Sequence, residues 1–99
     1  MALLDRFRRK KEEEEDGEVM RRARLLLNGR IAEGMVFDVT SDDAGCITHI
    51  FYSYNITGVD YESSQTLNHA QRRRQSDYAP GARVTVRYDP HQPTNSVVV

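Results

Sequence analysis

The fold is decided by a stretch near the carboxyl end that reads Tyr78-Ala79-Pro80-Gly81-Ala82-Arg83-Val84-Thr85-Val86-Arg87-Tyr88-Asp89-Pro90-His91-Gln92-Pro93-Thr94-Asn95-Ser96-Val97-Val98-Val99. Pro80-Gly81 is a turn signal, and apolar residues at alternate positions from Val84 to Tyr88 predict a strand with one face on a core. Pro90 and Pro93 then predict an interruption, because proline fixes its own φ and has no N–H to donate to a neighbouring strand. A last strand is expected at Val97–Val99.

The composition is that of a small soluble protein. The chain has 99 residues, of which 38% are hydrophobic and 29% charged, and its net charge is -1. This length allows one domain with a modest core, and the balanced charge gives no general attraction to nucleic acids or anionic membranes. A signal peptide is not expected, because the basic residues follow Leu3-Leu4 instead of preceding an apolar region. Cys46 is the only cysteine, so no disulfide can form within the chain, and we expect a cytoplasmic protein.

Charge and apolar spacing divide the chain into three parts. Residues 1–17 are predicted to be a charged flexible arm, with a basic run at Arg6–Lys11 before the acidic block Glu12–Asp16. Residues 18–29 are predicted to form an amphipathic helix that ends at Asn28-Gly29. Its apolar positions are Val19, Met20, Ala23, Leu26 and Leu27. We expect this apolar face to pack on the domain of residues 30–99, and contact with a partner is the alternative.

Three further strands are predicted before the carboxyl stretch, at residues 31–40, 46–56 and 59–67. In the second, Ile50, Tyr52, Tyr54 and Ile56 share one face, whereas both faces of the first are partly apolar and its inward frame stays open. Thr57-Gly58 predicts a tight hairpin into the third strand, where Val59 and Tyr61 are expected inward. Asn68 is expected to cap a short helix that runs toward Tyr78.

Three consecutive strands, a short helix and two more strands predict a mainly β fold. The order is that of a small five-stranded OB-like barrel, and an SH3-like barrel or a sandwich fits the same order. We expect the interior to be filled by the tyrosines Tyr52, Tyr54, Tyr61 and Tyr88, since tyrosine supplies bulk while its hydroxyl can reach a polar partner.

The spacing of these residues resembles a known family. The patterns are Tyr52-x-Tyr54-x-Ile56-x-Gly58-x-x-Tyr61, Tyr78-x-x-Gly81-x-x-Val84-x-Val86-x-Tyr88-Asp89-Pro90-x-x-Pro93-x-x-Ser96-Val97 and Ala32-x-Gly34-x-Val36. Over residues 31–99 they resemble the bacterial domain-of-unknown-function family 3592. The resemblance implies a β-rich fold and no established activity or catalytic residues. Many members of that family carry flanking transmembrane helices, which this sequence does not show, so we carry no membrane location over.

The residues that bear chemistry form no convincing metal or catalytic motif. Cys46 and His49 are three apart on a predicted strand and therefore point to opposite faces, which is poor geometry for one ion. His69 and His91 lie in separate segments, and no phosphate-binding glycine loop is present. We therefore expect no enzymatic activity, no metal and no cofactor.

We predict a non-enzymatic interaction or structural module whose partner is a protein. The candidate interaction surface comprises His49, Phe51, Arg72, Arg73, Arg74, Leu26 and Leu27. One alternative is an OB-like binder of single-stranded nucleic acid, favoured by Phe51 and Arg72–Arg74 and opposed by the carboxylates Asp60 and Glu62. A second is a membrane-surface adaptor that uses residues 1–11. The apolar run Val97–Val99 also allows a homodimer by pairing of edge strands.

Overall fold

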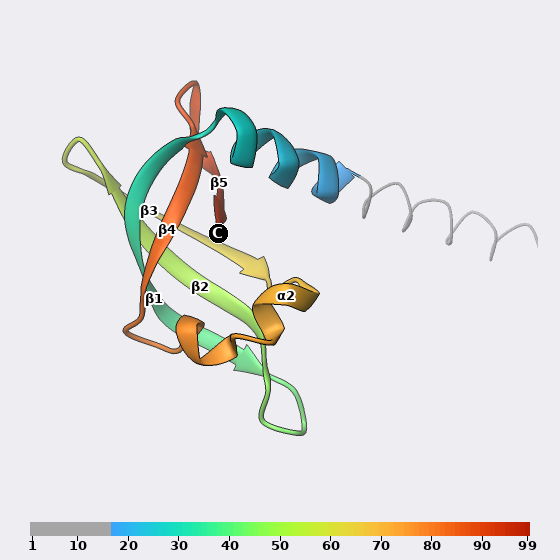
Figure 1. The fold of residues 1–99 in the computed structure, drawn as a ribbon. Coiled ribbons are helices and arrows are strands. Elements are labelled where there is room, and N and C mark those ends of the chain that lie inside the picture. The colour runs from blue at the N-terminus through green and yellow to red at the C-terminus, as the bar shows by residue number, and fades with distance from the viewer. Residues whose placement is uncertain (1–16) are drawn as a thin grey trace, which may run out of the picture.

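Five antiparallel strands make up most of residues 17–99, which are the residues that the computed structural model describes. The strands are β1 (Arg30–Ser41), β2 (Ile47–Ile56), β3 (Val59–Thr66), β4 (Arg83–Asp89) and β5 (Gln92–Val98). Two short helices, α2 (His69–Arg72) and η1 (Gln75–Tyr78), connect β3 to β4, and a helix over residues 17–28 precedes β1. The sheet order is β3-β2-β1-β4-β5, and the sheet curls into a nearly closed barrel (Figure 1). The mainly β fold with both helical segments is confirmed.

Strand β2 supplies much of the core, in the frame that the sequence predicts. Ile50, Tyr52 and Tyr54 are buried, and the Tyr54 ring stacks on Tyr52 at 5.8 Å and on the half-buried Tyr61 at 5.5 Å. The Tyr52 hydroxyl lies 2.7 Å from Ser96 Oγ, and the Tyr54 hydroxyl donates to the Pro93 carbonyl at 2.6 Å. Tyr52 and Tyr54 therefore fill the interior without leaving their hydroxyls unpaired, which would be costly in a buried site.

The face of β1 that points into the barrel carries Ala32, Gly34 and Val36. Gly34 is packed so tightly that an added Cβ would lie 2.7 Å from a methyl of Val86 and 2.8 Å from the carbonyl oxygen of Ser53. A β-bulge follows, because the register with β2 shifts between Val36 and Asp38. The bulge leaves both Phe37 and Asp38 exposed on the outer face of the sheet.

The connection between β3 and β4 begins as expected, at Asn68. Its side-chain oxygen accepts a hydrogen bond from the Gln71 amide, and the Gln71 side chain accepts one from the Asn68 amide, which completes a capping box. The helix then ends at Arg72 and a 3-10 turn begins at Gln75. This turn buries Tyr78, whose place in the core the sequence analysis did not predict.

Two details of the strand predictions are wrong. Pro93 does not precede the last strand but lies within β5. The pairing with β4 passes there from Asp89↔Gln92 to Tyr88↔Ser96. Pro93 therefore has no paired residue on β4 that would require the N–H that proline lacks. Val59 does not face inward as the sequence predicts; it is 52% exposed, because it lies beside the hairpin turn where the core ends.

The barrel is closed between β3 and β5 by side chains instead of a backbone ladder. Gln65 on β3 is buried; its side-chain oxygen accepts a hydrogen bond from the Val98 amide at 2.8 Å, and its side-chain nitrogen donates to the Val98 carbonyl at 3.2 Å. The Gln71 side chain donates to the same carbonyl at 2.9 Å. The edge of β5 at Val98, an expected site of dimerisation, is therefore occupied by two carboxamides of the same chain.

We expect Gln65→Ala to lower the free energy of unfolding by about 2 kcal/mol, because it removes two hydrogen bonds and leaves the Val98 amide buried and unpaired. Urea denaturation measures this change. Ser64→Ala, at an exposed neighbouring position, is the matched control and should change stability by less than about 0.5 kcal/mol. Equal effects of the two substitutions would contradict a closing role for Gln65.

The hairpin between β2 and β3 forms at the predicted residues, with positive φ at both Thr57 (50°) and Gly58 (85°). A β-branched residue is unfavourable in this left-handed region, whereas asparagine tolerates it. We therefore expect Thr57→Asn to raise the free energy of unfolding by about 0.5–1 kcal/mol. Thr57→Val keeps the branched Cβ and should bring no gain, so a similar gain in both variants would contradict this explanation.

Candidate functional site

The N-terminal helix lies over the gap between β3 and β5 and is held there by arginines. Arg21 donates to the Ser96 carbonyl of β5 at 2.8 Å, and Arg22 donates to the Thr66 carbonyl of β3 at 2.8 Å. Glu18, one turn earlier, accepts hydrogen bonds from both guanidinium groups at 2.8–2.9 Å. One carboxylate thus holds two arginines that reach the two edges of the gap.

These contacts shift the acid–base properties of the cluster. Hydrogen bonds from Arg21 and Arg22 lower the pKa of Glu18 from 4.5 to about 2, although partial burial acts in the opposite direction. The hydrogen bond to Glu18 in turn raises the pKa of Arg21. The carboxylate is therefore ionised across the physiological pH range, and the cluster stays charged.

The helix turns its apolar face to solvent. Leu25 is the apolar side chain that it buries, at 4% exposure, whereas Leu27 is 81% exposed and Val19 65% exposed. Met20, Ala23 and Leu26 are exposed as well. The expectation that this apolar face packs on the domain is wrong, because the gap between β3 and β5 presents backbone carbonyls, and carbonyls are matched by arginines and not by leucines.

At 100° per residue, the exposed apolar positions span an arc of about 120°. Ala23 is at its centre, and Leu26, Val19, Leu27 and Met20 flank it. The residues that contact the barrel, Glu18, Arg21, Arg22 and Leu25, lie on the opposite side. We call the first set the outward apolar face. It contains Leu26 and Leu27, two of the residues that the sequence singles out for interaction.

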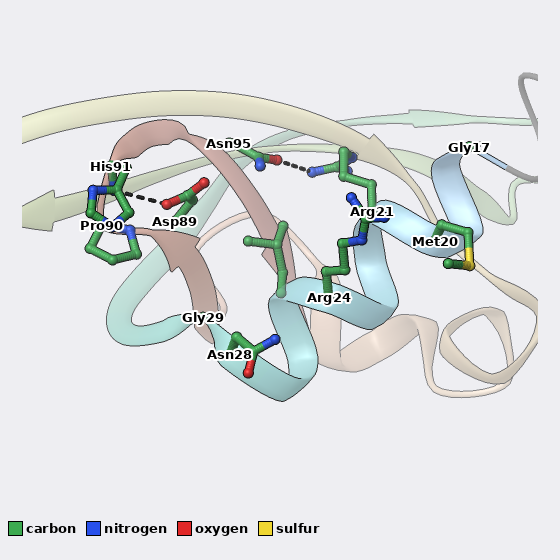
Figure 2. A pocket seen from close by; sticks show the side chains of 11 residues that line it. Gly17, Met20, Arg21, Arg24, Asn28, Gly29, Asp89, Pro90, His91 and Asn95 are labelled. Carbon is green, nitrogen blue, oxygen red and sulfur yellow. Dashed lines mark hydrogen bonds between the residues drawn. The ribbon is translucent and has the colours of Figure 1, made fainter.

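A groove of about 650 Å³ lies between this helix and the β4–β5 turn (Figure 2). The helix side contributes Met20, Arg21 and Arg24, and the turn contributes Asp89 and His91. Figure 2 shows Arg21 directed to Asn95 and His91 beside Asp89, whose carboxylate accepts a hydrogen bond from the His91 amide at 2.8 Å. Arg21, Asp89 and Asn95 are thus engaged in contacts that hold the turn and the helix in place.

The other predicted interaction residues lie elsewhere. Phe51 is on the outer face of β2, with its ring 5.2 Å from that of His49 and 6.4 Å from that of Phe37. Arg72, Arg73 and Arg74 are exposed in and after α2. Arg74 donates to the Tyr78 hydroxyl at 3.0 Å and lies 3.9 Å from the Asp77 carboxylate. Residues 1–11, the predicted membrane contact, lie outside the described residues.

Within residues 17–99, the structure shows no group of three or more histidine, cysteine, aspartate or glutamate side chains placed to hold a metal. Cys46 is exposed just before β2. In the same part of the chain, no helix has both the length and the hydrophobicity that crossing a membrane requires.

The residues that hold the helix were missed by sequence reasoning. Glu18 is followed by arginines three and four positions later, and this spacing is typical of ion pairs along a helix. That signal was available in the sequence. The contacts of Arg21 and Arg22 with strand carbonyls could not be predicted from sequence spacing, because they join residues 75 and 44 positions apart.

The fold and this helix define a small, nearly closed β-barrel domain with a helix across its open side. Residues 28–99 match the family model described as Domain of unknown function (DUF3592), and the chain belongs to this family. The matched residues begin at the last residue of the N-terminal helix and comprise the whole barrel. No curated protein and no solved structure gives a significant match.

The lowered pKa of Glu18 predicts a pH dependence. A carboxyl group whose pKa falls on folding stabilises the folded state above its unfolded pKa and loses that contribution as the pH falls through the folded value. We therefore expect wild type to be more stable than Glu18→Gln at pH 7, and the difference to disappear between pH 4.5 and about 2. Thermal unfolding of both chains across this range measures it. A difference that is constant with pH would contradict the Glu18 assignment.

Proposed function

We propose that this domain is a non-enzymatic interaction module that binds another protein through the outward apolar face of its N-terminal helix. The observation that carries the proposal is the orientation of the helix, which is anchored by arginines and presents Val19, Met20, Ala23, Leu26 and Leu27 to solvent. Full burial of one large aliphatic side chain contributes about 1.5–3 kcal/mol. Covering this face would therefore supply much of the free energy of a specific complex.

The shape of the face suits a helix or an apolar groove of the partner. Ala23 at its centre is small, so a second helix can approach closely between the larger side chains of Val19 and Leu27. The anchoring by Arg21 and Arg22 holds the helix in one position before binding. A preformed contact surface loses less conformational entropy on association than a flexible one.

The same contacts support binding over catalysis. In the groove beside the helix, Arg21 is paired with Glu18 and the Asp89 carboxylate accepts the His91 amide, so these groups already serve structural contacts. Phe51 is flanked by the carboxylate of Asp38, its partner in the register, which disfavours a nucleic-acid backbone at this position. The first observation disfavours catalysis in the groove, and the second disfavours nucleic-acid binding at Phe51.

Photo-crosslinking tests the proposal. A benzoylphenylalanine at position 27 should crosslink to a protein partner in cells, whereas the same group at position 59 should not, since Val59 is also apolar and exposed but lies on the β2–β3 hairpin. With the partner identified and purified, we expect Leu27→Ser to weaken binding at least tenfold and Val59→Ser to leave it unchanged.

Equal crosslinking from both positions would contradict the proposal. Two further results would also overturn it. One is flotation with anionic vesicles that depends on Leu27, which would assign the face to a lipid surface. The other is recovery of nucleic acid alone, which would favour the OB-like alternative.

A further inference from the structure

The outer face of β1, β2 and β3 is an acidic surface around an aromatic centre, and the proposed function does not use it. The β-bulge places Phe37 and Asp38 together opposite Phe51, and the Phe37 and Phe51 rings lie 6.4 Å apart. Phe37 and the nearby Met35 are each almost half exposed. A native sheet seldom leaves such side chains clustered in solvent without a binding role.

Three carboxylates lie on one side of this centre along the strands, and a fourth, that of Asp38, lies opposite Phe51. Glu33 is on β1, Asp60 and Glu62 are on β3, and these three line a shallow hollow of about 440 Å³ beside Met35. The Asp38 carboxylate accepts the amide of Val39, and Asp60 accepts the side-chain amide of Asn55. Within residues 17–99, none of these four carboxylates forms a salt bridge, and Arg83 on β4 is the basic residue that borders the hollow.

We propose that this acidic–aromatic face binds the basic segment Arg6–Lys11 of a second copy of the chain. The segment reads Arg6-Phe7-Arg8-Arg9-Lys10-Lys11 and joins five positive charges to one aromatic ring. Its cations match the four carboxylates, arginine can also stack on Phe37 or Phe51, and Phe7 matches the apolar centre. The segment Arg6–Lys11 and the acidic–aromatic face are therefore complementary both in charge and in apolar character.

The basic segment has a competitor in its own sequence, the acidic block Glu12–Asp16. Basic residues that precede acidic ones by four positions form the weaker orientation of helical ion pairs. Within a helix, this order would pair the two blocks weakly, and the carboxylates of a folded sheet offer the basic segment a preformed alternative.

A second copy is favoured over contact within one chain. The helix of residues 17–28 leads into β1, so Gly17 stands at its far end, about 18 Å from β1 along the helix axis. Figure 1 shows that this end points away from β1. To reach the face of its own barrel, the chain before Gly17 would have to reverse its direction. A second copy can present the basic segment without that reversal.

A charge-swap experiment on the full-length chain tests the proposal. One variant reverses the face with Glu33→Lys and Glu62→Lys, and the other reverses the segment with Arg8→Glu, Arg9→Glu and Lys10→Glu. We expect wild type to self-associate at 50 mM salt and to become monomeric at 0.5 M salt, because exposed charges are screened. Each variant alone should associate at least tenfold more weakly, and an equimolar mixture should regain association. Sedimentation velocity measures all four samples.

The matched control is Arg72→Glu with Arg73→Glu, which reverses exposed charges on another surface and should leave self-association unchanged. Circular dichroism and urea denaturation establish that every variant is folded before its association is compared. In the mixture, the face variant still supplies the wild-type basic segment and the segment variant still supplies the wild-type face, so regained association identifies these two elements as the contact.

Three results would overturn the proposal. The first is a wild type that stays monomeric at low salt and millimolar concentration. The second is a mixture of the two variants that remains as weakly associated as each alone. The third is association that persists in 0.5 M salt and is lost in Leu27→Ser, because it would belong to the outward apolar face of the helix.

Discussion

The structure depends on how the gap between β3 and β5 is bridged. A sheet with the order β3-β2-β1-β4-β5 has two edges, and unpaired edges are costly when buried and prone to aggregation when exposed. Gln65 resolves this by presenting one donor and one acceptor to Val98, as a neighbouring strand would. Gln71 adds a second donor, and it is positioned by the capping box that it forms with Asn68. Val98 on the edge of β5 is therefore bonded both to β3, through Gln65, and to α2, through Gln71.

The remaining carbonyls at this gap determine how the N-terminal helix docks. They require donors, so the face of the helix that carries Arg21 and Arg22 turns inward, and Glu18 keeps both guanidinium groups in place. The apolar residues are then left outside. The same polar match thus explains why Leu25 is the apolar side chain that the helix buries and why its other apolar side chains are exposed.

The local signals in the sequence were sufficient for much of the fold. The alternation from Ile50 to Ile56, the Thr57-Gly58 turn and the Asn68 cap each depend on a few neighbouring residues, and each is confirmed. Leu26 and Leu27 belong to the predicted interaction surface because their spacing places them on the apolar side of the helix. That spacing does not show which side of the helix contacts the barrel. Pro93 and Gln65 depend on partners distant in sequence, which no local pattern contains.

The anchoring of the helix also makes its surface conditional on the completed barrel. Thr66 and Ser96 come together only when β3 and β5 are side by side, and Gln65 forms that contact across 33 residues. A contact of such sequence separation has to be formed against the entropy of loop closure. Before that point Arg21 and Arg22 have no common docking site. A partner that recognises the helix in its anchored position therefore distinguishes finished domains from incompletely folded ones.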